Sequence, residues 1–237
     1  MSTFQNYKIP NDGLVLYYDA SNIKSYGGSG TRLLDLSRSS QDATLVNGVS
    51  FASGYLTFDG ADDGILLDYK QELNDLQSPL TITGWFMDSL TGINGPNFVQ
   101  SIFSQYTDVT IGNYVKAVNL YQRTIYYGSS SISGSPYLQS FSLVGLTYSV
   151  STWNFFSVTV DGNLTASVIT IGLNGIFQTF SATQMTPVNS ANIWIGNATD
   201  LGGNRFKGNL SSLSVYNKSL TNDEVLKVYE STKTKYI

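Results

Sequence analysis

The feature that most constrains the fold is that apolar stretches in this chain are short and turn residues separate them. Residues 153–160 and 167–173 are rich in β-branched and aromatic side chains, which favour strands. Asn-Gly pairs at 47–48 and 174–175 tolerate the positive φ angles of tight turns. The pattern predicts an all-β chain in which about a dozen strands form an antiparallel sandwich of jelly-roll type.

Other turns and irregularities follow from the same reasoning. The Asp/Gly cluster at 60–64 lies between two apolar runs, which predicts a hairpin. The pair at 47–48 likewise predicts a hairpin. Gly84 interrupts an alternating run at 80–87, and we expect it to mark a bulge. The Ser-rich stretch 129–142 is predicted to be a long surface loop or an insertion.

Only one segment has helical features. Thr221 and Glu224 fit a capping box, in which their side chains satisfy the first free backbone N–H groups. Apolar residues at 225, 226, 228 and 229 then give one face for packing. We expect one short C-terminal helix and a single domain from residue 13 to residue 237.

Composition excludes several functions. The 237 residues contain no Cys and no His, so disulfides, thiolate metal sites and Ser-His-Asp triads are ruled out. The net charge is −4 and the 13 Lys and Arg residues form no run, which argues against nucleic-acid binding. No apolar run is long enough to span a membrane. Because the N-terminus lacks the apolar core of a secretion signal, we expect synthesis in the cytoplasm without export.

The order of three sequence blocks resembles the laminin-G-like, concanavalin A-like jelly-roll superfamily. The first block is the hairpin motif at 55–65, which contains Phe-Asp-Gly-Ala-Asp-Asp-Gly-Ile. The second consists of the strand motifs at 80–86 and 153–160 with the hairpin at 173–176, and the third is the ending at 206–220 with its capped helix. The resemblance spans essentially the whole chain. It implies a lectin-like sandwich, which agrees with the strand pattern.

The front of the chain resembles a narrower variant found in structural proteins of tailed bacteriophages. Residues 13–26, 28–31, 35–37 and 43–48 carry this likeness, although Arg32 and Leu33 stand where the variant often has an aromatic residue. It implies a non-enzymatic virion protein on the head, tail or fibre, made in the host cytoplasm. Its partners would be other virion proteins, with homo-oligomerisation left open. Residues 1–12 would anchor the domain to another virion protein, or they would form an edge of the sandwich or a frayed terminus.

Catalysis by paired carboxylates is not expected. The related glucanases place two Glu residues around an Asp on one strand, whereas this chain has only Glu72, Glu224 and Glu230. Glu72 lies in a polar connection and the other two lie on the expected helix, so strand alternation cannot bring them together. The sequence therefore predicts no enzyme, no catalytic residues and no organic cofactor.

A metal site and a glycan site remain as hypotheses. Asp59, Asp62 and Asp63 could supply oxygen ligands for a structural Ca²⁺, or they could serve only as turn formers. Ser211 and Ser212 stand where the family often has an Asp pair. For glycans, loop aromatics and amides are the candidates, and they are Tyr26, Tyr106, Tyr137, Asn197 and Asn204. The three Trp residues lie in strand patterns and are expected in the core.

Two functions stay open at this point. The first is a bacteriophage virion component that attaches to other virion proteins and adheres to host or environmental glycans. The second is a free carbohydrate-binding lectin or adhesin module. Neither requires a nucleic acid or membrane insertion.

Overall fold

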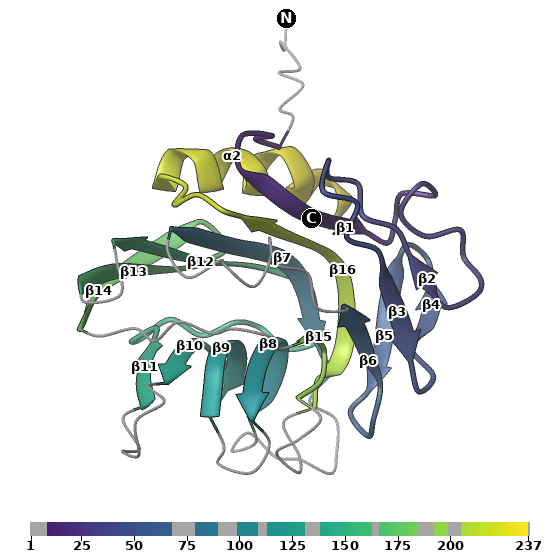
Figure 1. Ribbon diagram of the computed structural model, residues 1–237, viewed down its shortest axis with the longest axis horizontal. Coiled ribbons are helices and arrows are strands. Elements are labelled where there is room, and N and C mark those ends of the chain that lie inside the picture. The colour runs from purple at the N-terminus through teal and green to yellow at the C-terminus, as the bar shows by residue number, and fades with distance from the viewer. Residues whose placement is uncertain are drawn as a thin grey trace, which may run out of the picture.

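The protein is a two-layer β-sandwich with one helix on its outer surface (Figure 1). The computed structural model describes residues 9–67, 79–89, 99–108, 113–130, 138–162, 166–183, 192–198 and 205–236. Every strand pairing in both sheets is antiparallel. The predicted class, an all-β jelly-roll sandwich with a short C-terminal helix, is confirmed.

We call the two layers sheet A and sheet B. In spatial order, sheet A contains β14 (Ile176–Thr183), β13 (Ala166–Leu173), β12 (Asn154–Gly162), β7 (Leu80–Asp88), β16 (Lys207–Tyr216), β5 (Tyr55–Asp59) and β4 (Ser50–Ala52), with β1 (Leu14–Asp19) also paired to β16. Sheet B contains β11 (Leu138–Ser142), β10 (Thr124–Ser130), β9 (Asn113–Tyr121), β8 (Gln100–Asp108), β15 (Ile193–Ile195), β6 (Gly64–Leu67), β3 (Ala43–Val46) and β2 (Arg32–Leu33).

The main core fills the space between the sheets. Both layers contribute large side chains that are almost fully buried, among them Leu16, Phe58, Phe86, Phe103, Tyr127, Phe156 and Ile195. Gly84 is explained by this packing. A Cβ there would lie 2.7 Å from the Phe156 ring, so the glycine makes room for an aromatic side chain. The bulge expected at Gly84 lies instead on the neighbouring strand, where the β16 register shifts between Leu210 and Ser212.

A second apolar cluster attaches the helix α2 (Asn222–Thr232) to the outer face of sheet A. It consists of Trp85, Phe155, Tyr216, Leu220, Val225 and Val228. Trp85 is fully buried, stacks on Tyr236 at 4.3 Å between ring centroids, and donates its indole N–H to the Thr232 hydroxyl at 2.8 Å. The predicted capping box is present, with Thr221 accepting from the Glu224 backbone and Glu224 from the Thr221 backbone. A 3-10 turn, η1 (Lys233–Lys235), follows.

Two turns predicted as hairpins connect the sheets instead. Asn47 and Gly48 have the expected positive φ angles of 62° and 114°, but β3 belongs to sheet B and β4 to sheet A. Residues 60–63 likewise lead from β5 in sheet A to β6 in sheet B. The hairpin of this region lies at Ser53 and Gly54, between β4 and β5. A pair of residues with positive φ reverses the chain, but it does not decide which layer receives the next strand.

Of the other two turn and loop predictions, one is confirmed and one is wrong in part. The hairpin at Asn174 and Gly175 is confirmed, with Leu173 opposite Ile176. The long loop predicted at 129–142 is wrong at both ends, because residues 129 and 130 belong to β10 and residues 138–142 form β11, which pairs with β10.

We expect Trp85→Ala to lower the free energy of unfolding by about 3–5 kcal/mol, because it removes the centre of the cluster beneath α2 and leaves a cavity. Urea denaturation followed by circular dichroism would measure the change. Val144→Ala is the control, because Val144 is 73% exposed and its truncation should change stability by less than about 0.5 kcal/mol. A loss at Trp85 as small as that of the control would contradict this role.

Candidate functional site

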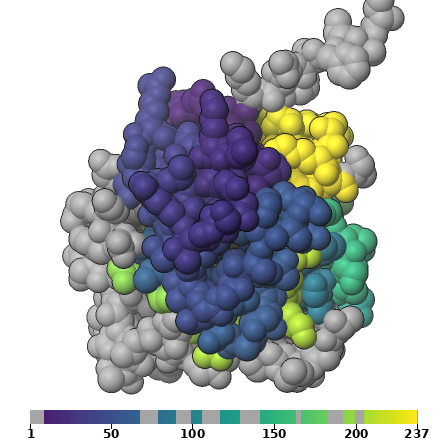
Figure 2. All heavy atoms as spheres, turned by 90° about the vertical axis from the view of Figure 1, so that its right-hand side faces the viewer, coloured from purple at the N-terminus to yellow at the C-terminus, as the bar shows by residue number. Residues whose placement is uncertain are grey.

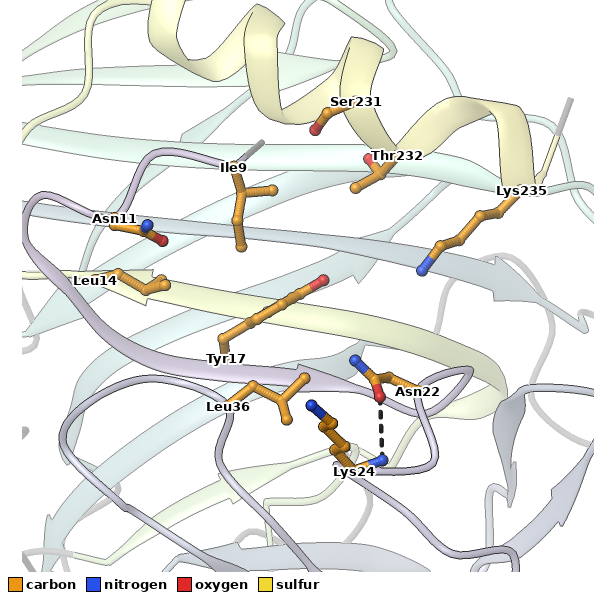
Figure 3. Close-up of a pocket in the computed structure, with 10 residues that line it drawn as sticks. All are labelled: Ile9, Asn11, Leu14, Tyr17, Asn22, Lys24, Leu36, Ser231, Thr232 and Lys235. Carbon is orange, nitrogen blue, oxygen red and sulfur yellow. Dashed lines mark hydrogen bonds between the residues drawn. The ribbon is translucent and has the colours of Figure 1, made fainter. Parts of the chain in front are cut away.

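A cavity of about 710 Å³ lies between β1 and the C-terminal end of α2 (Figure 3). Segments far apart in the sequence form its walls: the residues before β1, the loops after β1, and the end of α2 with η1. The face in Figure 2 shows this neighbourhood, with residues 9–67 lying together beside the C-terminal residues at their upper edge. The lining residues are Ile9, Asn11, Leu14, Tyr17, Asn22, Lys24, Leu36, Ser231, Thr232 and Lys235.

Strand β1 provides the floor of the cavity. Leu16 and Tyr18 are buried in the main core, whereas Tyr17 is only half-buried and lines the cavity, as strand alternation requires. The loop after β2 is fastened along β1, because Leu36 donates its N–H to the Tyr17 carbonyl and Asp35 accepts the Tyr17 N–H, both at 2.8 Å. The backbone N–H and carbonyl of Tyr17 are therefore both hydrogen-bonded to this loop.

A buried carboxylate lies beside the far end of Tyr17. Asp19, which is 3% exposed, accepts from the Tyr17 hydroxyl at 3.2 Å and from the Lys235 ammonium at 2.6 Å through the same oxygen. Its other oxygen accepts from the Ser21 backbone and hydroxyl. Burial, and then the negative charge of Asp19, raise the pKa of Tyr17 far above its usual range. Tyr17 is thus a neutral phenol at every physiological pH.

The helical wall uses its polar groups internally. The Ser231 hydroxyl donates to the Val228 carbonyl at 2.8 Å, and the Thr232 hydroxyl donates to the same carbonyl at 2.7 Å while accepting from Trp85. The opposite wall is different. There Lys24 is exposed, and its backbone N–H fixes the Asn22 side chain by donating to the amide oxygen at 3.0 Å (Figure 3). The exposed polar side chains of the lining are Lys24 on this loop, Asn11 before β1 and Lys235 in η1.

The residues predicted to bind glycans are placed elsewhere. Tyr26 is 6% exposed, packs edge-on against Phe51 and donates its hydroxyl to the Gly30 carbonyl at 2.8 Å, so its ring faces are covered. Asn197 is 1% exposed and donates its amide to the Asp62 carbonyl at 2.9 Å. The Tyr106 side chain and residues Tyr137 and Asn204 lie outside the described part of the chain.

Sequence reasoning missed the cavity for a definite reason. Tyr17 lies in a strand that is apolar on both faces, so alternation did not mark it as a surface residue. Lys235 and Lys24 are separated by most of the chain, and only the fold brings them to one cavity. The only available signal was the Asn-Ile-Lys sequence at 22–24 directly after the first strand.

The three predicted metal ligands do come together. One carboxylate oxygen of each of Asp59, Asp62 and Asp63 lies within 4.8 Å of the others. Asp63 is buried and accepts the Asp59 backbone N–H at 2.9 Å, and Asp59 accepts the Ala61 N–H at 2.6 Å. Burial raises the pKa of Asp63, and the neighbouring charges of Asp59 and Asp62 add to the rise. The turn hydrogen bonds and a Ca²⁺ site are both compatible with this geometry, so Ca²⁺ binding stays a prediction.

The glutamates within the described residues are engaged in the helix region. Glu224 caps α2 and pairs with Lys218 at 2.9 Å, and Glu230 pairs with Lys233 at 2.5 Å. Glu72 lies outside the described residues. The helical placement agrees with the expectation that Glu224 and Glu230 form no catalytic pair on a sheet face.

Comparison with known proteins identifies the family. Residues 59–226 match the model of a laminin-G-type family described as the concanavalin A-like lectin/glucanases superfamily. The chain belongs to this superfamily. A search of curated protein sequences finds no significant match. In the described part of the chain, helices are too short or too polar to cross a membrane.

Solved structures with the same fold include receptor-binding domains of botulinum neurotoxins. The domain of the C/D mosaic serotype superposes with a TM-score of 0.67 at 14% identity, over 94% of this chain and 52% of that one. A serotype DC binding domain in complex with SialylT gives 0.68 at 13%, and one in complex with rat synaptotagmin II gives 0.67 at 13%, each over 93% of this chain and 52% of the other. This superfamily member thus spans about half the length of those structures, and at such identities the likeness establishes the fold.

We predict that the Asp59–Asp63 turn responds to pH and to Ca²⁺ through Asp63. Because its folded pKa is raised, the folded state holds this proton more tightly than the unfolded state, and stability from this group is lost as pH rises through the folded pKa. In a chelator at neutral pH, Asp63→Asn should therefore melt at or above the wild-type temperature, with the difference shrinking in acid.

Addition of Ca²⁺ separates the two interpretations of the turn. If the cluster binds the ion, Ca²⁺ should raise the melting temperature of the wild type in a concentration-dependent way, and Asp63→Asn should lose that rise. Differential scanning calorimetry with Ca²⁺ and with chelator would measure it. Identical wild-type melting in both solutions would leave the aspartates as turn formers.

Proposed function

We propose that the chain is a non-enzymatic carbohydrate-binding module and that its sugar occupies the cavity beside β1. The observation that carries this proposal is the mixed lining of the cavity. An aromatic ring, three aliphatic side chains, two amides and two ammonium groups face one space of about 710 Å³, a size typical of small-molecule sites.

Sugars suit such a lining because a pyranose has an apolar C–H face and a polar rim. Tyr17, Leu14 and Leu36 provide apolar surface on the floor and on one side of the cavity. The amides of Asn11 and Asn22 can donate to and accept from sugar hydroxyls. Tyr17 is preorganised, because its backbone bonds to Asp35 and Leu36 and its hydroxyl bonds to Asp19, so that little conformational entropy is lost when a ligand binds.

The same lining argues against hydrolysis. A retaining glycosidase needs two carboxyl groups about 5–5.5 Å apart. Among the described residues, the cavity lining contains no carboxylate, and the nearby Asp19 is occupied by Lys235, Tyr17 and Ser21. The structures in complex with SialylT and with synaptotagmin support a recognition role for this architecture, although they are about twice as long.

We expect Tyr17→Ala to weaken glycan binding about tenfold, the effect of losing roughly 1.4 kcal/mol of contact with the ring. Tyr17→Phe should bind nearly as well as the wild type, because it keeps the ring and loses only the hydroxyl that contacts Asp19. A glycan array would identify ligands, and titration calorimetry would compare the variants.

Tyr126→Ala is the matched control, because Tyr126 is a half-buried tyrosine on sheet B, in the other layer. It should bind normally. Asn22→Ala tests the cavity without altering β1 and should also weaken binding. If a glycan binds Tyr17→Ala and Asn22→Ala as tightly as the wild type, the cavity is not its site. If the array shows no glycan bound to the wild type, the proposed function is wrong.

A role in a bacteriophage particle is proposed as the setting for this activity. It is supported by the resemblance of residues 13–26 and 43–48 to phage structural proteins. Quantitative mass spectrometry of purified particles should find the chain at hundreds of copies if it decorates the head, or at a handful if it belongs to a tail or fibre. Its absence from particles would leave the free lectin.

A further inference from the structure

We infer that the cavity selects sugars that carry a carboxylate, and that Lys24 and Asn22 recognise that group. This inference rests on the proposed glycan-binding function and adds the charge of the ligand. It depends on the charge balance of the lining, on the hydrogen-bond donors of the 22–24 loop, and on the apolar surface that lies next to Lys24.

The charge balance of the cavity is positive. Lys24 and Lys235 both line it. The Lys235 ammonium is neutralised by Asp19 at 2.6 Å and also contacts the Ser21 hydroxyl at 3.0 Å. Lys24 has no ion-pair partner within the described residues. One uncompensated positive charge therefore faces the cavity in a protein whose net charge is −4.

The Asn22 side chain is oriented to assist this charge. Its amide oxygen accepts the Lys24 backbone N–H at 3.0 Å, which leaves the amide NH₂ directed away from the loop. Figure 3 shows the Lys24 side chain extending toward Tyr17 and Leu36 with the Asn22 amide beside it. An ammonium and an amide NH₂ at one end of a cavity offer donors to the two oxygens of a carboxylate.

Apolar side chains lie beside this charge. Leu36 lies between the Lys24 side chain and the Tyr17 ring (Figure 3). Ile9 and Leu14 lie beyond the ring, with Asn11 next to Leu14. A pyranose whose C–H face lies on Tyr17 would direct a ring carboxylate toward Lys24. Since Lys24 is exposed, the gain over a neutral sugar should be moderate and sensitive to salt.

The test compares sugars that differ only in the acidic group. The probes are methyl glucuronide and methyl galacturonide, each with its neutral methyl glycoside, and N-acetylneuraminic acid as a second source of carboxylate. Chemical-shift titrations of the full chain should give roughly tenfold tighter binding of an acidic sugar than of its neutral partner at about 20 mM salt. The preference should fall toward unity at about 500 mM salt, while neutral binding stays constant.

Charge-removing variants assign the preference to its residue. Lys24→Gln should abolish the preference for the acidic sugar over its neutral partner. Arg123→Gln removes one positive charge from an exposed position at the β9–β10 turn in sheet B and should keep the preference, which controls for net charge.

The outcomes distinguish failure of this inference from failure of the proposed glycan-binding function. Equal binding of acidic and neutral sugars by the wild type, or a preference that survives Lys24→Gln, would overturn the selection for a carboxylate and leave glycan binding intact. Failure of every sugar to bind would overturn both.

Discussion

The structure depends on the way β16 shares its backbone hydrogen bonds among three strands. Along one side it pairs with β7 over most of its length. Along the other side, Lys207–Leu210 pair with β5 and Ser212–Tyr216 pair with β1. The register shift at Ser211 coincides with this change of partner. The Ser211 carbonyl accepts the N–H of Ala20, the residue after β1, and the Ser211 hydroxyl accepts from the Tyr236 hydroxyl. One irregular residue thus joins the first strand, the last strand and the C-terminal turn.

The candidate site is a consequence of that arrangement. Because β1 pairs with only the second half of β16, it lies at a border of sheet A and not within it. Its outer face is covered on one side by α2, which the Trp85 cluster fastens to the sheet, and on the other by the loop that Asp35 ties to Tyr17. The cavity is the space between α2 and this loop above the outer face of β1.

The sequence was informative about elements and less so about their assembly. The capping box at Thr221 and the Asn174 hairpin depend on neighbouring residues, and both were predictable. The layer entered after Asn47 or after Asp59 depends on packing across the whole sandwich, so both turns were misjudged. The Asp59–Asp63 group was visible because its members are adjacent in sequence. Tyr17, Lys24 and Lys235 were not, because their proximity exists only once β1 and α2 occupy the same face.

The cavity also has a bearing on how this domain would behave within a larger assembly. Its walls contain Ile9 and Asn11 from the first described residues and Lys235 from the last. A module fused directly before Ile9 or directly after Lys235 would be tethered at the rim of the cavity, where it would compete with ligand for space. Insertion at the turn between β9 and β10, which contains the exposed Arg123 and lies in the other sheet, would leave the rim clear. Fusion design and surface immobilisation would therefore tune access to the site without altering one residue that lines it.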